Sequence, residues 1–251
     1  PDARVAHKSP GNIKRGYKNH IIVDEESEII LGSTQTPFNV GDEKQLIPLL
    51  EKVENDHGII PEQVTADKVY GTYDNRAYLK DNNISCNIDF YKESSRETSG
   101  YLTKDFEISP DLKSTKCPNG VITTFVKTYE DRLTFKFSTN TCKACPLRNN
   151  CFPKRDLKKN SGRQVTVHPR YDVMLIARER IETEDFKSAM NKRFKIERRF
   201  ATQVLNHGLR RCRYLTLTGA KIHITMANLA NNIVRMVNLL SSRKPPSFAM
   251  S

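Results

Sequence analysis

Residues 186–213 read FKSAMNKRFKIERRFATQVLNHGLRRCR, and this stretch decides the architecture expected around it. Neither Pro nor Gly interrupts it before Gly208, so a long helix can form. Apolar residues recur in it at roughly helical spacing, at Phe194, Ile196, Phe200, Val204 and Leu205. The pattern predicts a helix over residues 185–206 that buries one side and presents a row of cations on the other.

The charges of this stretch are unusual because nine Lys or Arg accompany one acid, Glu197, and no further Asp or Glu follows up to residue 251. Arg193 stands four residues before Glu197, so the two side chains share a helix face. One interpretation is an ion pair on a solvated helix, which is the usual role of such a Glu. The other is a carboxylate that binds a divalent metal beside cations that bind phosphates.

The composition indicates a globular protein with a polyanionic partner. The 251 residues are 37% hydrophobic and carry a net charge of +12, with a pI of about 9.4. This length suits one large domain or a domain with an insertion. Nucleic acid is the simplest partner for such a charge, although charge alone leaves an anionic membrane surface or the ribosome open.

The sequence shows no export signal and no membrane span. Residues 1–10 lack the apolar core of a signal peptide, and polar residues interrupt the most apolar stretch, residues 215–240. We therefore predict a cytoplasmic protein without a membrane partner, in a compartment that disfavours disulfides. The chain begins with Pro rather than Met, so we expect it to be part of a longer protein.

Strand and helix patterns alternate along the chain and predict a mixed α/β fold. Residues 1–15 are expected to be irregular. Strands are expected at 16–24 and 28–35, which form a hairpin, and at 64–66, 84–91, 122–129 and 133–138. Helices are expected after Asp42, which with Gln45 resembles a capping box, and at 74–82, 170–183, 185–206 and 214–240. The expected domains are 1–91, a β-rich insertion at 92–168, a helical part at 169–241, and a tail at 242–251.

Asp67 is the second candidate for chemistry, because it directly follows the short strand at 64–66. In α/β sheets, ligand contacts gather where strands end, although an Asp that makes a turn is also common there. Two carboxylates far apart in sequence can share Mg²⁺ or Mn²⁺ and leave room for a substrate phosphate. The cations that could bind DNA phosphates nearby are Arg193, Arg198, Arg199, Arg210, Arg211 and Arg213.

Four cysteines stand between these two acids, at positions 117, 142, 145 and 151. A Cys-x₂-Cys pair with two further cysteines can form a tetrahedral zinc site, which could stabilise a small β-rich insertion. The final spacing, from Cys145 to Cys151, is longer than the usual one. Disulfides and free thiols are therefore alternatives to zinc bound by Cys117, Cys142, Cys145 and Cys151. Cys86 and Cys212 look like ordinary structural cysteines.

Taken together, the chain resembles the DDE transposases of bacterial insertion sequences, in the sub-group with a cysteine-rich insertion. Five stretches carry the likeness, in the order of the family and along nearly the whole chain. They are PDAR at 1–4, GYKNHIIVDEESEIILGSTQTPFNVGD at 16–42, ADKVYGTYDNRAYLKDNNI at 66–84, CPNG with CKACPLRNNC at 117–120 and 142–151, and RFKIERRFATQVLNHGLRRCRYLTLTG at 193–219, trailed by ANLANNIVRM.

The resemblance implies an RNase H-like catalytic core with three metal-binding carboxylates. It places the second Asp at Asp67, the Glu at Glu197 and the Arg of the signature at Arg193. It implies Mg²⁺ or Mn²⁺ as cofactor, DNA ends and target DNA as partners, and a homodimer as a candidate assembly. The cysteine pattern of the sub-group falls on the four cysteines named above.

Three departures from the family qualify the resemblance. The first catalytic Asp of the family lies upstream of PDAR, and Asp2, Asp24 and Asp42 are poor substitutes for it. A Tyr often stands where this chain has Met190, and a Lys where it has Val204. The missing Asp would stop the chemistry in this chain alone.

The sequence thus leaves three functions to weigh. The leading one is a DNA transposase catalytic domain that hydrolyses a phosphodiester at the element end and transfers the strand. The second is a catalytically inactive, transposase-derived protein that binds nucleic acid. The third is a structural zinc module with a basic face, for example for RNA, in which Asp67 and Glu197 lie far apart.

Overall fold

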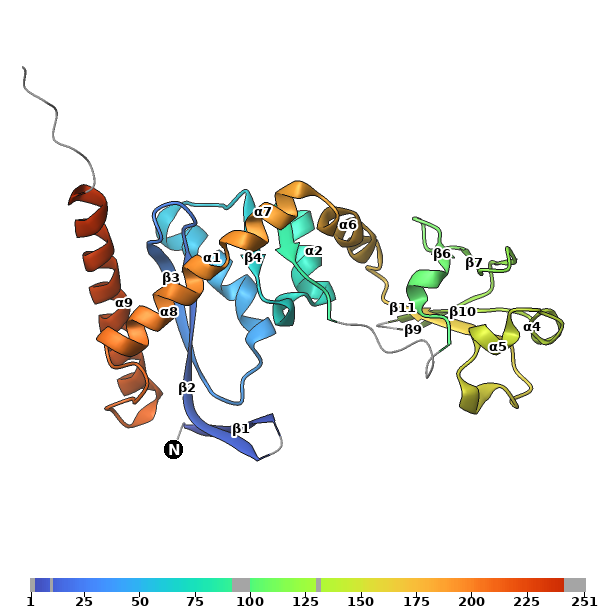
Figure 1. The fold of residues 1–251 in the computed structure, drawn as a ribbon, viewed down its shortest axis with the longest axis horizontal. Coiled ribbons are helices and arrows are strands. Elements are labelled where there is room, and N and C mark those ends of the chain that lie inside the picture. Colours follow the sequence, from blue (N-terminus) through green and yellow to red (C-terminus); the bar gives the residue numbers. More distant parts are fainter. Residues whose placement is uncertain (1–2, 10, 92–99, 130–131, 242–251) are drawn as a thin grey trace, which may run out of the picture. The chain divides into compact units, whose positions relative to one another are not determined.

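The computed structural model describes residues 3–9, 11–91, 100–129 and 132–241. These residues form a mixed α/β structure, as predicted, in two compact units (Figure 1). Unit 1 combines Pro1–Asp89 with Arg180–Ser251, and unit 2 comprises Phe90–Glu179. The expected domain boundary at 168/169 differs from this division, because residues 172–179 of helix α6 cluster with unit 2. The expected tail, 242–251, lies outside the described residues.

Unit 1 begins with an antiparallel sheet of β1 (Arg4–Ser9), β2 (Asn12–Val23) and β3 (Ile30–Pro37), in that order. The predicted hairpin is confirmed as β2 and β3. The expectation that residues 1–15 are irregular was wrong, because β1 pairs with the first half of β2, with Arg4 opposite Gly16. Backbone pairing forms this strand from a polar sequence, which side-chain patterns do not reveal.

A short 3-10 turn, η1 (Asp42–Gln45), leads into helix α1 (Leu46–His57). The helix buries Leu46, Leu49, Leu50 and Val53, which recur in the sequence at helical spacing, and it ends at Gly58 with φ +66°. The predicted capping box was wrong. Asp42 lies inside the 3-10 turn, and its carboxylate forms an ion pair with Lys18 at 2.6 Å instead of capping the helix.

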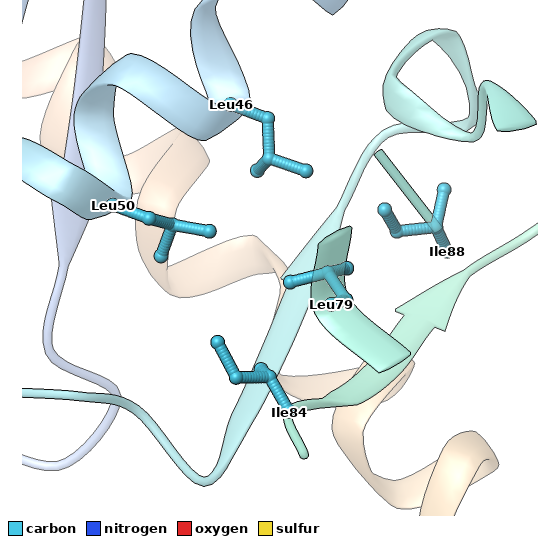
Figure 2. Packing of buried hydrophobic residues seen from close by; sticks show 5 residues of the cluster. All are labelled: Leu46, Leu50, Leu79, Ile84 and Ile88. Atoms are coloured by element: carbon cyan, nitrogen blue, oxygen red, sulfur yellow. The ribbon is translucent and has the colours of Figure 1, made fainter. Parts of the chain in front are cut away.

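A parallel pair of strands, β4 (Gln63–Ala66) and β5 (Ser85–Ile88), is connected through turn η2 (Lys68–Tyr70) and helix α2 (Tyr73–Asp81). The strand predicted at 84–91 is thus shorter than expected. Side chains of α1, α2 and β5 build one hydrophobic core, and Figure 2 shows that they converge: Leu46, Leu50, Leu79, Ile84 and Ile88. This core fixes the end of β4, where Asp67 stands.

The hairpin of β2 and β3 contacts α1 on one face and α9 (Thr216–Ser241) on the other (Figure 1). Ile22 packs against the core that α1 shares, whereas Asn19 donates to Asn228 of α9 at 3.2 Å. An odd spacing along a strand sends two side chains to opposite faces. The amide of Asn232 also pairs with both backbone groups of Ile30, at 2.8 and 2.9 Å. Asparagines of α9 therefore hold it to the sheet.

Two helices, α7 (Glu184–Lys192) and α8 (Phe194–Asn206), replace the single helix predicted at 185–206. They meet at Arg193, which keeps helical torsions (φ −57°, ψ −26°), so no loop separates them. Thr183 caps α7 by accepting a hydrogen bond from the amide of Phe186 at 3.2 Å. Arg193 therefore stands at a junction rather than inside a continuous helix.

Unit 2 contains two small antiparallel sheets and short helices. One sheet consists of β6 (Glu107–Ile108), β7 (Thr115–Lys116) and β8 (Ile122–Thr123), and the other of β9 (Val126–Tyr129), β10 (Arg132–Lys136) and β11 (Gln164–Val167). The strand predicted at 122–129 is thus divided between two sheets. The helical segments are η3 (Thr103–Asp105), α4 (Thr139–Lys143), α5 (Arg148–Cys151), η4 (Lys154–Asp156) and the first part of α6 (Asp172–Ile181).

Hydrophobic side chains from the second sheet supply much of the interior of unit 2. Phe135, Val165 and Val167 are almost fully buried, as is Phe137 just after β10, and Thr134 of β10 is buried as well, so the strand does not simply alternate between a buried and an exposed face. Among the described residues, none of the helices, α9 included, has the length and apolarity required to cross a membrane.

Candidate functional site

Asp67 and Glu197 meet at one guanidinium group. Nη1 of Arg193 lies 3.3 Å from Oδ1 of Asp67, and Nη2 of the same arginine lies 3.3 Å from Oε1 of Glu197. Asp67 follows β4 and caps η2, whereas Glu197 lies in the first turn of α8. The structure therefore brings together the two acids that the sequence singles out. It also contains the ion pair of the simpler interpretation, between Arg193 and Glu197.

Two side chains of α2 hold the loop that carries Asp67. The side-chain amide of Asn75 donates to the carbonyl of Tyr70 at 2.9 Å, and Nε of Arg76 donates to the carbonyl of Gly71 at 3.2 Å. Both side chains are buried. Asp67 itself accepts a hydrogen bond from the amide of Lys68 at 2.8 Å. These contacts give the carboxylate a defined position at the strand end.

Helix α8 is held by the turn of the hairpin. Nζ of Lys195 in α8 donates to the carbonyl of Glu25 at 2.8 Å, and Nζ of Lys192, the last residue of α7, lies 2.6 Å from Oε1 of the same glutamate. At the other end of the helix, buried Gln203 accepts from Asn19 of β2 at 3.3 Å. The helix that carries Glu197 is thus fixed to the sheet at both ends.

The meeting point of the two acids is open to solvent. The side chains of Asp67 and Glu197 are 59% and 65% exposed, and that of Arg193 is 34% exposed. Exposed ion pairs of this kind contribute little to stability, typically about 0–1 kcal/mol. A competing cation can therefore replace the arginine beside the two carboxylates, and a phosphate can replace a carboxylate beside the arginine, at low cost.

Tyr70 lies beside this group of charges. Burial, and then the negative charges of Asp42, Asp67 and Glu43, raise the pKa of Tyr70 to about 12. The phenol therefore stays protonated over the whole neutral range. It adds a polar but uncharged group near Asp67.

Carboxylate oxygens are the donors that Mg²⁺ takes in proteins, often only one or two from the protein together with water and substrate phosphate. Asp67 and Glu197 fit this donor set, and their shared guanidinium shows that both face a position suited to a cation. Within the described part of the chain, however, no group of three or more His, Cys, Asp or Glu is arranged to hold a metal ion. A third acid does not join this pair there.

A second carboxylate–arginine cluster occupies the other side of α8. Glu28, in the turn of the hairpin, has a side chain only 4% exposed and pairs with three arginines. Arg198 contacts Oε1, Nη2 of Arg199 lies 3.1 Å from Oε2, and Nη2 of Arg235 lies 3.4 Å from Oε1. Burial lowers the pKa of Arg199, and Glu28 opposes this shift. Two of the arginines expected to contact DNA therefore pair with a buried carboxylate.

The other expected DNA contacts are placed differently. Arg210, Arg211 and Arg213 lie in the connection between α8 and α9, and all three are exposed. They are accessible to a phosphate backbone. Of the cations that the sequence singles out, Arg193 contacts the two acids and these three face solvent.

The four cysteines of unit 2 line one cavity. Cys117, Cys142, Cys145 and Cys151 share it with three phenylalanines and with Arg148 and Arg163. Burial, opposed by Arg163 and assisted by the other three cysteines, raises the pKa of Cys151 to about 11. The four thiols therefore lie close enough to interact, although as they stand they are not arranged as a group of metal ligands.

Comparison with known families adds an independent observation. Residues 116–237 match the family model of a transposase DDE domain. The match covers just under half of the chain, includes Glu197 and the four cysteines, and supports a DDE transposase. Asp67 lies before the matched stretch. No curated protein and no solved structure matches the chain.

Proposed function

We propose that this chain is a catalytic portion of a DNA transposase, in which Asp67 and Glu197 bind Mg²⁺ or Mn²⁺. The observation that carries the proposal is the convergence of these two carboxylates on one guanidinium, from elements far apart in sequence. An isolated zinc module with a basic face has no reason to bring them together. The matched transposase DDE domain agrees with this interpretation.

In the proposed reaction, water attacks a phosphodiester at the end of a DNA element, and the freed 3′-hydroxyl then attacks target DNA. Bound metal ions would activate the attacking oxygen and stabilise the leaving oxygen. The chain itself supplies position and charge: the end of β4 holds Asp67, and α8 holds Glu197. No side chain has to act as a nucleophile.

Arg193 has two roles in this proposal. Without metal, it neutralises the repulsion between Asp67 and Glu197 and keeps both carboxylates in place. If Asp67 and Glu197 held a metal ion instead, the guanidinium of Arg193 would be free to pair with a phosphate oxygen of the DNA, for which its planar geometry is suited. Arg210, Arg211 and Arg213 would bind the DNA backbone, which gives affinity without sequence preference.

The third carboxylate of the proposed site is expected on a strand upstream of residue 1. Within the chain, Asp24 accepts hydrogen bonds from Ser27, and Asp42 pairs with Lys18, so both are engaged elsewhere. A strand between the hairpin β2–β3 and the pair β4–β5 would unite the two sheets into an RNase H-like one. The RNase H-like core is therefore part of the proposal.

The test is a DNA cleavage assay with the parent protein and its element ends, with and without Mg²⁺. Changing Glu197→Gln or Asp67→Asn should lower the cleavage rate by about a thousandfold, because several kcal/mol of charge stabilisation are lost. Glu62→Gln, at an exposed acid beside β4, is the matched control and should keep full activity. Cleavage by the Glu197→Gln variant at the parental rate would refute the proposed role.

The second candidate function is DNA binding without catalysis. It is favoured by the lack, among the described residues, of a third acid beside Asp67 and Glu197. In that case the parent protein binds DNA with a strong salt dependence but never cleaves it. Binding assays at several salt concentrations, run beside the cleavage assay, separate the two functions.

A further inference from the structure

We propose that Cys117, Cys142, Cys145 and Cys151 bind one structural Zn²⁺ ion in unit 2. The site is independent of the proposed function, because it involves neither Asp67 nor Glu197. The observation that carries it is the shared cavity: four thiols from two separate segments of the chain line the same small space.

The first thiol comes from a tight turn that follows β7. The amide of Cys117 donates to the carbonyl of Val121 at 2.8 Å, and the amide of Gly120 donates to the carbonyl of Cys117 at 2.8 Å. Gly120 adopts φ +81°, which a glycine accepts without strain. This turn between β7 and β8 presents the sulfur of Cys117 to the cavity.

The other three thiols come from the segment that holds α4 and α5. Cys142 lies in α4, Cys145 stands two residues after the end of that helix, and Cys151 is the last residue of α5. The Cys-x₂-Cys pair at Cys142 and Cys145 has the spacing at which one segment donates two ligands to zinc. Two short helices, joined by a bend after Cys145, thus direct three sulfurs into one space.

The chemistry of the cavity suits zinc bound by thiolates. Every described cysteine has a free thiol, including these four. The remaining described lining is largely apolar, with Phe106, Phe137 and Phe152, and none of it is acidic. Four sulfur ligands in tetrahedral geometry are typical of structural zinc sites, and a hard cation such as Mg²⁺ would prefer oxygen.

Two arginines at the cavity supply positive charge that can balance the negative charge of a zinc ion with four thiolates. Four thiolates around Zn²⁺ carry a net charge of −2, and Arg148 and Arg163 line the same cavity. The backbone amide of Arg163 donates to Sγ of Cys142 at 3.3 Å, an interaction that favours the thiolate form of the sulfur. Nε of Arg163 is buried without a hydrogen-bond partner, so it remains available to a thiolate.

Zinc binding requires a local rearrangement of the thiols. As the side chains stand, no three of the described His, Cys, Asp or Glu form a metal-binding group. Because the sulfurs already face one space, we expect rotations about the Cα–Cβ bonds of the cysteines to complete the coordination. A cysteine can change between staggered rotamers without a change of the backbone.

The ion would join two parts of unit 2 that are otherwise held weakly. The strands β6, β7 and β8 have two residues each, and few hydrogen bonds can tie such a sheet to the rest. Bonds from zinc to Cys117 on one side and to the other three cysteines on the other would connect this sheet to the α4–α5 segment. Folding of unit 2 should then depend on the ion.

The primary experiment measures the zinc content of the full chain after purification and dialysis against excess Zn²⁺ and then buffer. We expect about one Zn²⁺ per chain. Cys145→Ser should lose it, and Cys212→Ser, at an exposed cysteine of unit 1, should keep it. A wild-type chain that binds no zinc, or a Cys145→Ser variant that keeps it, overturns the proposal.

A second experiment keeps the proposal testable where Cys145→Ser does not fold. The wild-type chain is titrated with Co²⁺, whose absorption spectrum reports its ligands. Intense bands of tetrahedral Co²⁺ with a thiolate charge-transfer band support the site. A weak, octahedral spectrum overturns it, as does mass spectrometry that finds the four cysteines joined in disulfides in freshly purified protein.

Discussion

Helix α8 takes part in two carboxylate–arginine clusters that use the same chemistry in opposite surroundings. In the first cluster, Glu28 is buried and pairs with Arg198, Arg199 and Arg235. In the second, Glu197 and Asp67 are exposed to solvent and both pair with Arg193. The side chain of Glu28 is 4% exposed and that of Glu197 is 65% exposed. Pairing with arginine therefore does not distinguish a carboxylate fixed in the structure from one that can exchange its partner, but burial does.

The difference follows from the cost of removing a charge from water. A buried carboxylate without its partners is strongly unfavourable, so Glu28 holds the hairpin turn to α8 and α9. An exposed carboxylate loses little when its partner leaves, because water replaces the arginine. One side of α8 is thus fixed, and the other remains free to exchange ligands.

The largest effect is expected at the buried cluster. Glu28→Gln removes the negative charge and leaves three arginines facing one another, so the free energy of unfolding should fall by about 3 kcal/mol. Urea unfolding followed by circular dichroism measures it. Glu25→Gln, in the same turn but more exposed, is the control and should cost much less. Equal losses in the two variants would contradict the distinction.

A smaller effect is expected when matched arginines are changed in the two clusters. Arg199→Met should lower the free energy of unfolding by about 2 kcal/mol, because a nearly buried charge-assisted contact is lost. Arg193→Met should lower it by less than about 0.5 kcal/mol, as for exposed pairs. If Arg193→Met lowers the free energy of unfolding more than Arg199→Met does, the exposed cluster of Arg193, Asp67 and Glu197 has a structural role.

The smallest effect is expected for the salt dependence of the coupling free energy between each arginine and its glutamate. Raising the ionic strength from about 0.01 M to about 1 M shortens the Debye length from about 30 Å to about 3 Å. The coupling between Arg193 and Glu197, measured by a double-mutant cycle, should fall to near zero at high salt. The coupling between Arg199 and Glu28 should persist, because water and ions do not reach it. Loss of both couplings would mean that the buried cluster opens.

The sequence predicts those features that depend on local patterns. The buried stripe of α1 follows from the helical spacing of its apolar residues, whereas the alternation along β10 holds only in part, because Thr134 is buried beside Phe135. The β1 strand was missed because backbone pairing with β2 forms it, and its side chains carry no such pattern. The junction at Arg193 was missed because the residues around it continue the helical periodicity.

The sequence also singles out Asp67 and Glu197, and the structure brings them together, whereas their catalytic roles remain a proposal. Glu28 was missed because the sequence places it at the start of the strand predicted at 28–35, whereas it lies in the hairpin turn before β3, with a left-handed φ of +58°. One signal could have indicated it: after Glu197 no acid follows, so a buried Arg199 or Arg235 needs a carboxylate from earlier in the chain. Sequence order alone does not say which acid that is.

The pairing of Asn232 with Ile30 has a consequence for how α9 can move. The side-chain amide meets both the N–H and the carbonyl of one residue of β3, as a neighbouring strand would. Sliding the helix by one turn in one direction would put Met236 opposite Ile30 and leave two backbone groups without partners. Sliding it in the other direction would bring Asn228 there and break its hydrogen bonds with Asn19 and Gln203. The 26-residue helix therefore has a single register on the sheet and does not slide along it.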